Sequence, residues 1–329
     1  MAKLKISDKL INILIDGLLI YFGNFKKFFI YMAFPVLGQL LGILWIFGFN
    51  YLYTSNLPSL IAKYPVFNNF STIILVTLII ALPGMFLFMK AFWDFLVAYG
   101  ALNSMTEAAI TTGKIYDFPA YNAVVTRRTF KYIALWLLFS IFTLIAISPL
   151  FWIIGIIFFI YFVLIFQVFT FEEDKSVTDC FKRSLFLVKG DFARTFAILT
   201  FLAVLTYWLI GWGLNLLLNV TGLTDQLSLM LEGWAKSFPL DNVNSMLATF
   251  NAPQITPLDI AKGVIEQIVF FVCVGFTLPL RSITWTLWYK NLSSIKDKPV
   301  KNSSKMYSAS KKKLDPEILR RAKEKDDQN

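Results

Sequence analysis

Apolar residues occur along this chain in long runs that charged side chains rarely interrupt. The longest run, from Tyr132 to Phe171, contains no charged residue. As a single helix it would be about 60 Å long, twice the thickness of the hydrocarbon core of a bilayer. The pair Ser148-Pro149 lies near its middle and is a turn signal. The run therefore predicts two membrane spans joined by a tight turn.

The complete pattern predicts an all-α integral membrane protein with six transmembrane helices. A helix needs about 20 apolar residues to cross a bilayer, because its backbone must satisfy its own hydrogen bonds there. We expect three helical hairpins within a membrane domain at residues 1–290, with prolines bending the second and sixth spans. The expected spans are residues 28–49, 73–99, 132–148, 150–171, 193–220 and 263–289.

Basic residues predict the orientation of these spans. Cytoplasmic segments of membrane proteins carry an excess of Lys and Arg. With the N-terminus inside, only Lys63, Lys236 and Lys262 of the 31 Lys and Arg residues lie outside. We therefore expect a multi-pass protein of the inner (plasma) membrane of the cell, with both termini in the cytoplasm.

The segments before the outward-going spans have a helical pattern of their own. In residues 5–22 the polar side chains share one narrow stripe, which predicts an amphipathic helix lying in the membrane plane. Similar segments occur at 106–128 and 176–188. The pattern G-[ND]-F-x-[KR]-x-F begins at both Gly23 and Gly190. We expect its glycine to end the in-plane helix and its Asn or Asp to cap the next one.

The basic residues next to the membrane are the expected contacts with lipid. Anionic head groups attract cytoplasmic basic residues at about 1 kcal/mol each. The candidates are Lys26, Lys27, Arg194, Lys311, Lys312 and Lys313. The last three belong to a basic tail, residues 291–329, which is also a candidate contact for a protein partner. No aromatic residues interleave its charges, so nucleic acid is not an expected partner.

The remaining long connection, residues 221–262, predicts two short amphipathic helices separated by Phe238-Pro239. Such a segment is expected to lie on the outer leaflet, and a lid over a cavity is the alternative interpretation.

Composition argues against most catalytic chemistry. The chain has no histidine, which removes the commonest general base and zinc ligand. Its two cysteines, Cys180 and Cys273, stand alone and outside any CxxC motif. The consecutive carboxylates Glu172, Glu173 and Asp174 are expected to cap the following in-plane helix rather than to bind a metal. We expect neither a cofactor nor an enzymatic activity.

Charged side chains are costly within membrane spans, so those that occur there are candidate functional residues. Lys90 and Asp94 are four residues apart near the inner end of the second span, and Arg281 has the same position on the sixth. If the two spans are adjacent, Asp94 and Arg281 could pair across a cavity, although anchoring at the head groups is the simpler interpretation. Glu266, four residues after Lys262, predicts an ordinary helical ion pair.

The first span contains a small-residue motif. Gly38 and Gly42 form GxxxG, which allows another helix to approach closely, and Gln39 between them can hydrogen-bond across that contact. We expect packing within one molecule rather than dimerisation.

Several stretches together resemble a group of uncharacterised prokaryotic membrane proteins. They are the in-plane helix before Gly23-Asn24-Phe25, the segment TEAAITTGKIYDFPAYNAVVTRR, the stretch SVTDCFKRSLFLVKGDF and the closing LWYKNLS. The group includes the YciC-like proteins and the membrane domain fused to some glycerophosphodiester phosphodiesterases. The resemblance covers residues 6–295 and implies six helices with no established activity. Nothing in this chain resembles the catalytic residues of the phosphodiesterase.

These observations favour a non-enzymatic protein that organises lipid or partner proteins in the membrane. The alternative is a small-solute or lipid transporter whose path runs between the proline-bent second and sixth spans. A membrane enzyme is the third hypothesis. Glu107-Ala108-Ala109 with Gly113 is similar to the loop by which importer permeases hold their ATPase, but the Ile and Pro of the fuller motif are missing.

Overall fold

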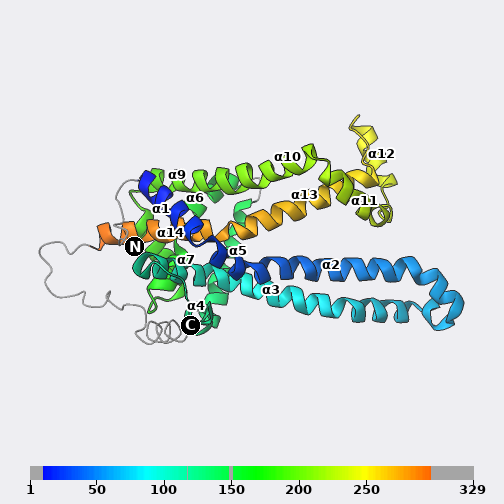
Figure 1. Cartoon of the computed structure of the whole chain (residues 1–329), viewed down its shortest axis with the longest axis horizontal. Coiled ribbons are helices and arrows are strands. Elements are labelled where there is room, and N and C mark those ends of the chain that lie inside the picture. The colour runs from blue at the N-terminus through cyan, green and yellow to red at the C-terminus, as the bar shows by residue number, and fades with distance from the viewer. Residues whose placement is uncertain (1–9, 117, 148–150, 298–329) are drawn as a thin grey trace, which may run out of the picture. The chain divides into compact units, whose positions relative to one another are not determined.

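The computed structural model describes residues 10–116, 118–147 and 151–297, and these form helices without any strand (Figure 1). Long apolar runs are expected to form helices in a membrane, because a helix satisfies its own backbone hydrogen bonds. In chain order the elements are α1 (Leu10–Gly23), α2 (Phe25–Lys63), the short η1 (Pro65–Asn68), α3 (Phe70–Thr112), α4 (Phe118–Thr126), α5 (Thr129–Ile147), α6 (Trp152–Phe162), α7 (Ile165–Phe171), α8 (Val177–Val188), α9 (Phe192–Ala203), the π-helical η2 (Val204–Trp212), α10 (Gly213–Val220), α11 (Leu223–Ala235), α12 (Asp241–Thr249), α13 (Pro257–Phe276) and α14 (Leu278–Lys296).

The helices have the length and composition of membrane spans. Within the described residues, five are long and apolar enough to cross a bilayer, or six if α4 and α5, which are bent by 73° at their junction, form one span. Large apolar side chains on them face outward: in α3, Phe86 is 68% exposed and Leu75 is 58% exposed. A water-soluble domain does not expose such faces at this scale. The chain is therefore an all-α, multi-pass membrane protein.

Several helices extend beyond the predicted spans. Helix α2 continues well past Phe49, and α3 continues through Pro83 and on to Thr112. The expected in-plane segment 106–128 is thus not one separate helix, because no proline lies between Tyr99 and Thr112 and Gly100 does not interrupt α3. Helix α3 ends only at Gly113, whose φ of 75° favours glycine.

At the predicted bend near Pro279 the helix is broken at a single residue, Thr277. Helix α13 ends at Phe276, and α14 begins at Leu278 with Pro279 in its first turn. Proline is tolerated there because the first turn of a helix has no intrahelical acceptor for its N–H groups.

The chain divides into two compact units. Of the described residues, unit 1 comprises those within 10–31, 96–200 and 278–297, and unit 2 comprises Met32–Phe95 and Phe201–Thr277. Each has its own core, and each is described by itself.

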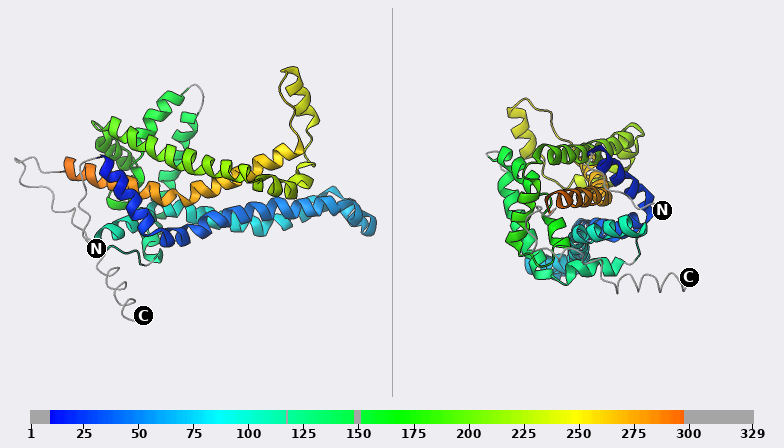
Figure 2. Two further views of the ribbon diagram at one scale, coloured as in Figure 1. Left: turned by 45° about the horizontal axis from the view of Figure 1, so that its top comes forward. Right: turned by 90° about the vertical axis from the view of Figure 1, so that its left-hand side faces the viewer.

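Helix α14 is the centre of unit 1. It contacts α1, α7 and α8 and is buried on almost every side (Figure 2). Small hydroxyl-bearing residues make this possible: Thr284 lies against Gly17 of α1, where an added Cβ would be only 2.7 Å from the Thr284 hydroxyl oxygen. The indole of Trp288 donates to Thr195 of α9, 3.0 Å away.

Helix α1 retains an outward apolar stripe while it packs on α14. Ile13, Gly17 and Ile20 are buried, whereas Ile11 and Leu19 are more than 60% exposed. A helix is thus present in the segment expected at 5–22, of which residues 5–9 lie outside the described part of the chain, and its orientation in the membrane plane stays a prediction.

Unit 2 consists of two groups of helices. The part of α2 from Met32 onward lies beside α3 (Figures 1 and 2), and α13 packs against α11, η2 and α10. An added Cβ at Gly211 of η2 would lie 2.9 Å from the ring of Phe270 in α13, so η2 and α13 are in close contact.

Candidate functional site

Helix α8 has well-defined ends, and both follow from the sequence. Ser176 is the N-cap: its hydroxyl accepts from the backbone N–H of Asp179, and its own backbone N–H donates to the Asp179 carboxylate, which completes a capping box. The Ser176 hydrogen bond lowers the pKa of Asp179. At the other end Gly190 has a φ of 92°. The predicted role of Glu172–Asp174 as the cap is wrong, because the capping box begins at Ser176, beyond those carboxylates.

One face of α8 is buried in unit 1. Cys180, Phe181, Leu187 and Val188 pack towards α5, α6, α7 and α14, and the Ser184 hydroxyl donates to the carbonyl of Tyr161, 2.8 Å away. Burial raises the pKa of the Cys180 thiol to about 11. That thiol is therefore protonated and unreactive near neutral pH.

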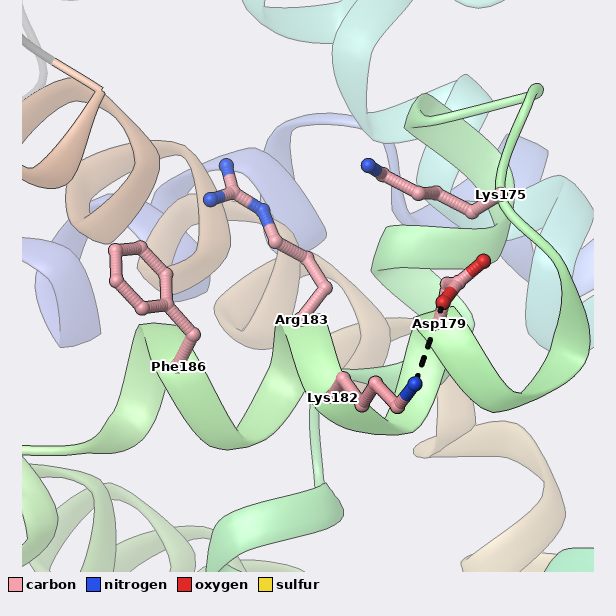
Figure 3. Close-up of a pocket in the computed structure, with 5 residues that line it drawn as sticks. All are labelled: Lys175, Asp179, Lys182, Arg183 and Phe186. Atoms are coloured by element: carbon pink, nitrogen blue, oxygen red, sulfur yellow. Dashed lines mark ion pairs between the residues drawn. The ribbon is translucent and has the colours of Figure 1, made fainter.

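The other face of α8 lines a shallow hollow of about 330 Å³ (Figure 3). Its lining carries three cations, one carboxylate and one aromatic ring: Lys175, Lys182, Arg183, Asp179 and Phe186. Lys182 is 79% exposed, and its ammonium lies 3.9 Å from Asp179, a loose surface pair. The Arg183 guanidinium lies 5.5 Å from the Phe186 ring centroid.

Arg183 is the most constrained of these cations. Its Nε donates to Glu172 Oε1 at 2.8 Å, and its Nη2 donates to Asp297, the last described residue. The Glu172 carboxylate also accepts from the Tyr289 hydroxyl, 2.9 Å away. Burial alone would lower the pKa of Arg183, but the hydrogen bonds to Asp297 and Glu172 outweigh it and raise that pKa. The guanidinium is therefore permanently charged and bridges α8 to α14.

Lys296 at the end of α14 caps the C-terminus of α8. Its ammonium donates to the carbonyls of Phe186, Leu187 and Lys189, and it lies 3.7 Å from Asp191. These carbonyls have no partner within α8, and the negative end of the helix dipole favours a cation there. The end of α14 is thus attached to α8 by two successive residues, Lys296 and Asp297.

A buried polar cluster lies deeper in unit 1, around Asn103 of α3. The Asn103 amide nitrogen donates to the Phe166 carbonyl and to Thr170. Its amide oxygen accepts from Gln167 at 3.2 Å, Ser282 at 2.8 Å and Thr286 at 3.1 Å. All of these side chains are at most 5% exposed. The cluster joins α3, α7 and α14 into one core.

The predicted intramembrane ions lie in different units. Lys90 and Asp94, in unit 2, form an ion pair with each other at 2.5 Å, and Lys90 also lies 5.8 Å from the Phe34 ring centroid. Arg281 belongs to unit 1, so its pairing with Asp94 stays a prediction.

The glycine motif of α2 lies against α3 within unit 2. A Cβ at Gly38 would lie 2.8 Å from that of Ala91, and a Cβ at Gly42 would lie 2.8 Å from the Gly84 carbonyl oxygen. The Gln39 amide donates to the carbonyl of Pro35 in its own helix, at 2.7 Å.

The predicted lipid-contacting residues are only partly described. Lys26 and Lys27 are exposed, and Arg194 is exposed beside Asp191, 3.3 Å away. Lys311, Lys312 and Lys313 lie outside the described residues.

Unit 2 also contains a polar cluster in which the charged residues pair differently from the sequence-based prediction. Lys262 pairs with Asp225 of α11 at 2.7 Å, and Glu266 instead accepts from Asn219 of α10 at 2.9 Å. Asn215 donates to the Glu266 backbone carbonyl. The predicted Lys262–Glu266 pair does not form because α11 brings a better-placed carboxylate to Lys262.

Among the described residues, no three Cys, Asp or Glu side chains are grouped as a metal site requires. Comparisons of the chain with protein-family models, curated proteins and solved structures find no match.

Proposed function

We propose that the protein is a non-enzymatic, membrane-organising protein of a prokaryotic inner membrane that gathers anionic phospholipids. The observation that supports this most is the hollow beside α8, which Lys182 and Arg183 of α8 line together with Lys175 from the preceding turn. A phosphate group is the natural ligand of such a cluster, because charge-assisted hydrogen bonds from Lys and Arg are strong and directional.

The position of α8 in the chain favours a lipid head group over a free phosphate ester. It lies between two apolar helices, residues 152–171 and 192–220, each long enough to cross a membrane. A short link between consecutive spans lies at their shared membrane surface. The hollow would then face the phosphate layer, on the cytoplasmic side that the basic residues predict.

Replacing Lys175 and Lys182 together with glutamine should weaken binding of phosphatidylglycerol roughly 30-fold, because each basic residue contributes about 1 kcal/mol. The measurement is native mass spectrometry of protein released from nanodiscs of equal phosphatidylglycerol and phosphatidylcholine. The control is Lys63→Gln with Lys236→Gln, which removes the same charge from exposed positions in unit 2. Equal retention of phosphatidylglycerol by both double variants would contradict the proposal. Displacement of the lipid by glycerol phosphate would instead identify a site for soluble phosphate esters.

The proposed topology has six spans and cytoplasmic termini, and a cysteine reporter tests it. Ser310→Cys should resist a membrane-impermeant maleimide in intact cells and react after permeabilisation, whereas Ser237→Cys in the outer segment should react in both. Background labelling should be low, since Cys180 is fully buried and Cys273 is only 8% exposed. Reaction of Ser310→Cys in intact cells would overturn the topology.

A transporter is the second candidate function, and unit 2 supports it. Nine residues of one apolar helix, Val204–Trp212, are π-helical, a rare geometry that often marks functional sites. The following helix, α10, carries Asn219, whose amide donates a hydrogen bond to Glu266 of α13. Solute flux into proteoliposomes that is lost in Glu266→Gln and kept in Glu232→Gln would favour a transporter over a membrane-organising protein.

A further inference from the structure

The charges around the α8 hollow nearly cancel in the described structure. Lys175 and Lys182 lie on the side of the hollow that carries Asp179, and Arg183 is held by two further carboxylates, Glu172 and Asp297. Because the cations and carboxylates balance, a phosphate that enters the hollow gains little net electrostatic attraction. One of the three carboxylates must move away before the hollow carries a net positive charge.

The two carboxylates on Arg183 differ in how firmly they are held. Glu172 has a side chain only 17% exposed and is fixed by a second donor, the Tyr289 hydroxyl. Asp297 is 49% exposed, and Arg183 is its ion-pair partner in the described structure. Asp297 is therefore the exchangeable anion, and its carboxylate occupies one of the donors that a phosphate would use.

We propose that Asp297 is an internal competitor of the phospholipid head group, so that lipid binding at α8 and docking of the last turn of α14 exclude each other. This inference rests on the proposed head-group site and adds its regulation. Docked, Asp297 neutralises Arg183, and Lys296 holds the same turn of α14 on the carbonyls of α8. A head-group phosphate takes the Arg183 donor and releases that turn, which leads directly into the basic tail of the sequence.

Two variants of the full-length protein test the competition in the same nanodiscs. Asp297→Asn should raise phosphatidylglycerol affinity about fivefold, the effect of one charge at the site. Its control is Asp174→Asn, which makes the same charge change at an exposed turn residue close to α8 in sequence. An equal increase in both variants would show a general charge effect and overturn the competition.

For Lys296→Gln, a pure charge effect and the proposed competition predict opposite changes in phosphatidylglycerol affinity. Removal of a cation should weaken anion binding if only charge matters, whereas loss of the α8 cap should undock Asp297 and strengthen it. We expect stronger binding, together with faster amide exchange over residues 291–297 when phosphatidylglycerol is added to the wild type. Weaker binding, or unchanged exchange, would overturn the inference. If the Lys175→Gln, Lys182→Gln variant still loses the lipid, that result would leave the proposed head-group site supported. If that variant binds the lipid normally, the proposed head-group site is wrong as well.

Discussion

Replacing Asn103 with leucine should lower the free energy of unfolding by about 3 kcal/mol or more. Its amide oxygen is the shared acceptor of Gln167, Ser282 and Thr286. A buried donor that loses its acceptor costs about 1–3 kcal/mol. Leucine has the same branched skeleton of side-chain heavy atoms as asparagine but accepts no hydrogen bond, so the donors from α7 and α14 would lose their common partner at once.

The measurement is equilibrium unfolding of the purified protein in mixed detergent micelles, followed by tryptophan fluorescence. Asn56→Leu is the matched control, because Asn56 is exposed and its amide donates only to the Leu52 carbonyl in its own helix. That substitution should change stability by less than about 0.5 kcal/mol. Similar effects of the two leucines would show that the Asn103 cluster does not hold unit 1 together.

The same cluster shows where sequence reasoning reaches its limit. The apolar runs predict helices and their approximate positions, because the bilayer imposes a length on every span. Asn103 gives no such signal: it lies beyond the second predicted span, and its partners Ser282 and Thr286 are about 180 residues away. Only the packing of α3 on α14 brings them together.

The ends of α8 show the opposite case. Ser176 and Asp179 have the capping-box spacing, and Gly190 has the positive φ expected of a glycine that ends a helix. The matching Gly23 is the last residue of α1, and its φ is not positive, so the two copies of the sequence pattern differ in backbone conformation. Both glycines therefore lie at the end of their helices as the pattern predicts, and only Gly190 has a positive φ.

The α8 hollow could be predicted only in part. Lys182 and Arg183 stand out as the basic pair of an amphipathic segment. Asp297 and Lys296 do not, because they reach α8 from the far end of α14, more than 100 residues away. Likewise Glu266 has the spacing of a helical ion pair with Lys262, but Asp225 of another helix takes that lysine. Neighbouring elements, which periodicity does not describe, decide which charges pair.

Gly42→Ala should destabilise unit 2 by about 1–3 kcal/mol, the usual cost of overpacking. A Cβ there would lie 2.8 Å from the Gly84 carbonyl oxygen and equally close to the Phe88 backbone nitrogen. Both atoms belong to the backbone of α3, so no side-chain rotation can relieve the contact, and the two helices must separate. Separation also removes the dispersion contacts that drive helix association in a bilayer, where lipid tails are as apolar as the side chains.

Gly48→Ala is the matched control in the same helix, since a Cβ at Gly48 would meet no atom within 4 Å. Alanine is the better helix former by roughly 0.5–1 kcal/mol, so this variant should be neutral or slightly more stable. Thermal unfolding of both variants in one detergent separates the effect of the close contact from that of helix propensity. The close contact should lower the unfolding temperature of Gly42→Ala, whereas helix propensity should leave that of Gly48→Ala unchanged or raise it. Equal midpoints would mean that the glycine faces of α2 and α3 do not meet, and the unit 2 hairpin would then need a different packing surface.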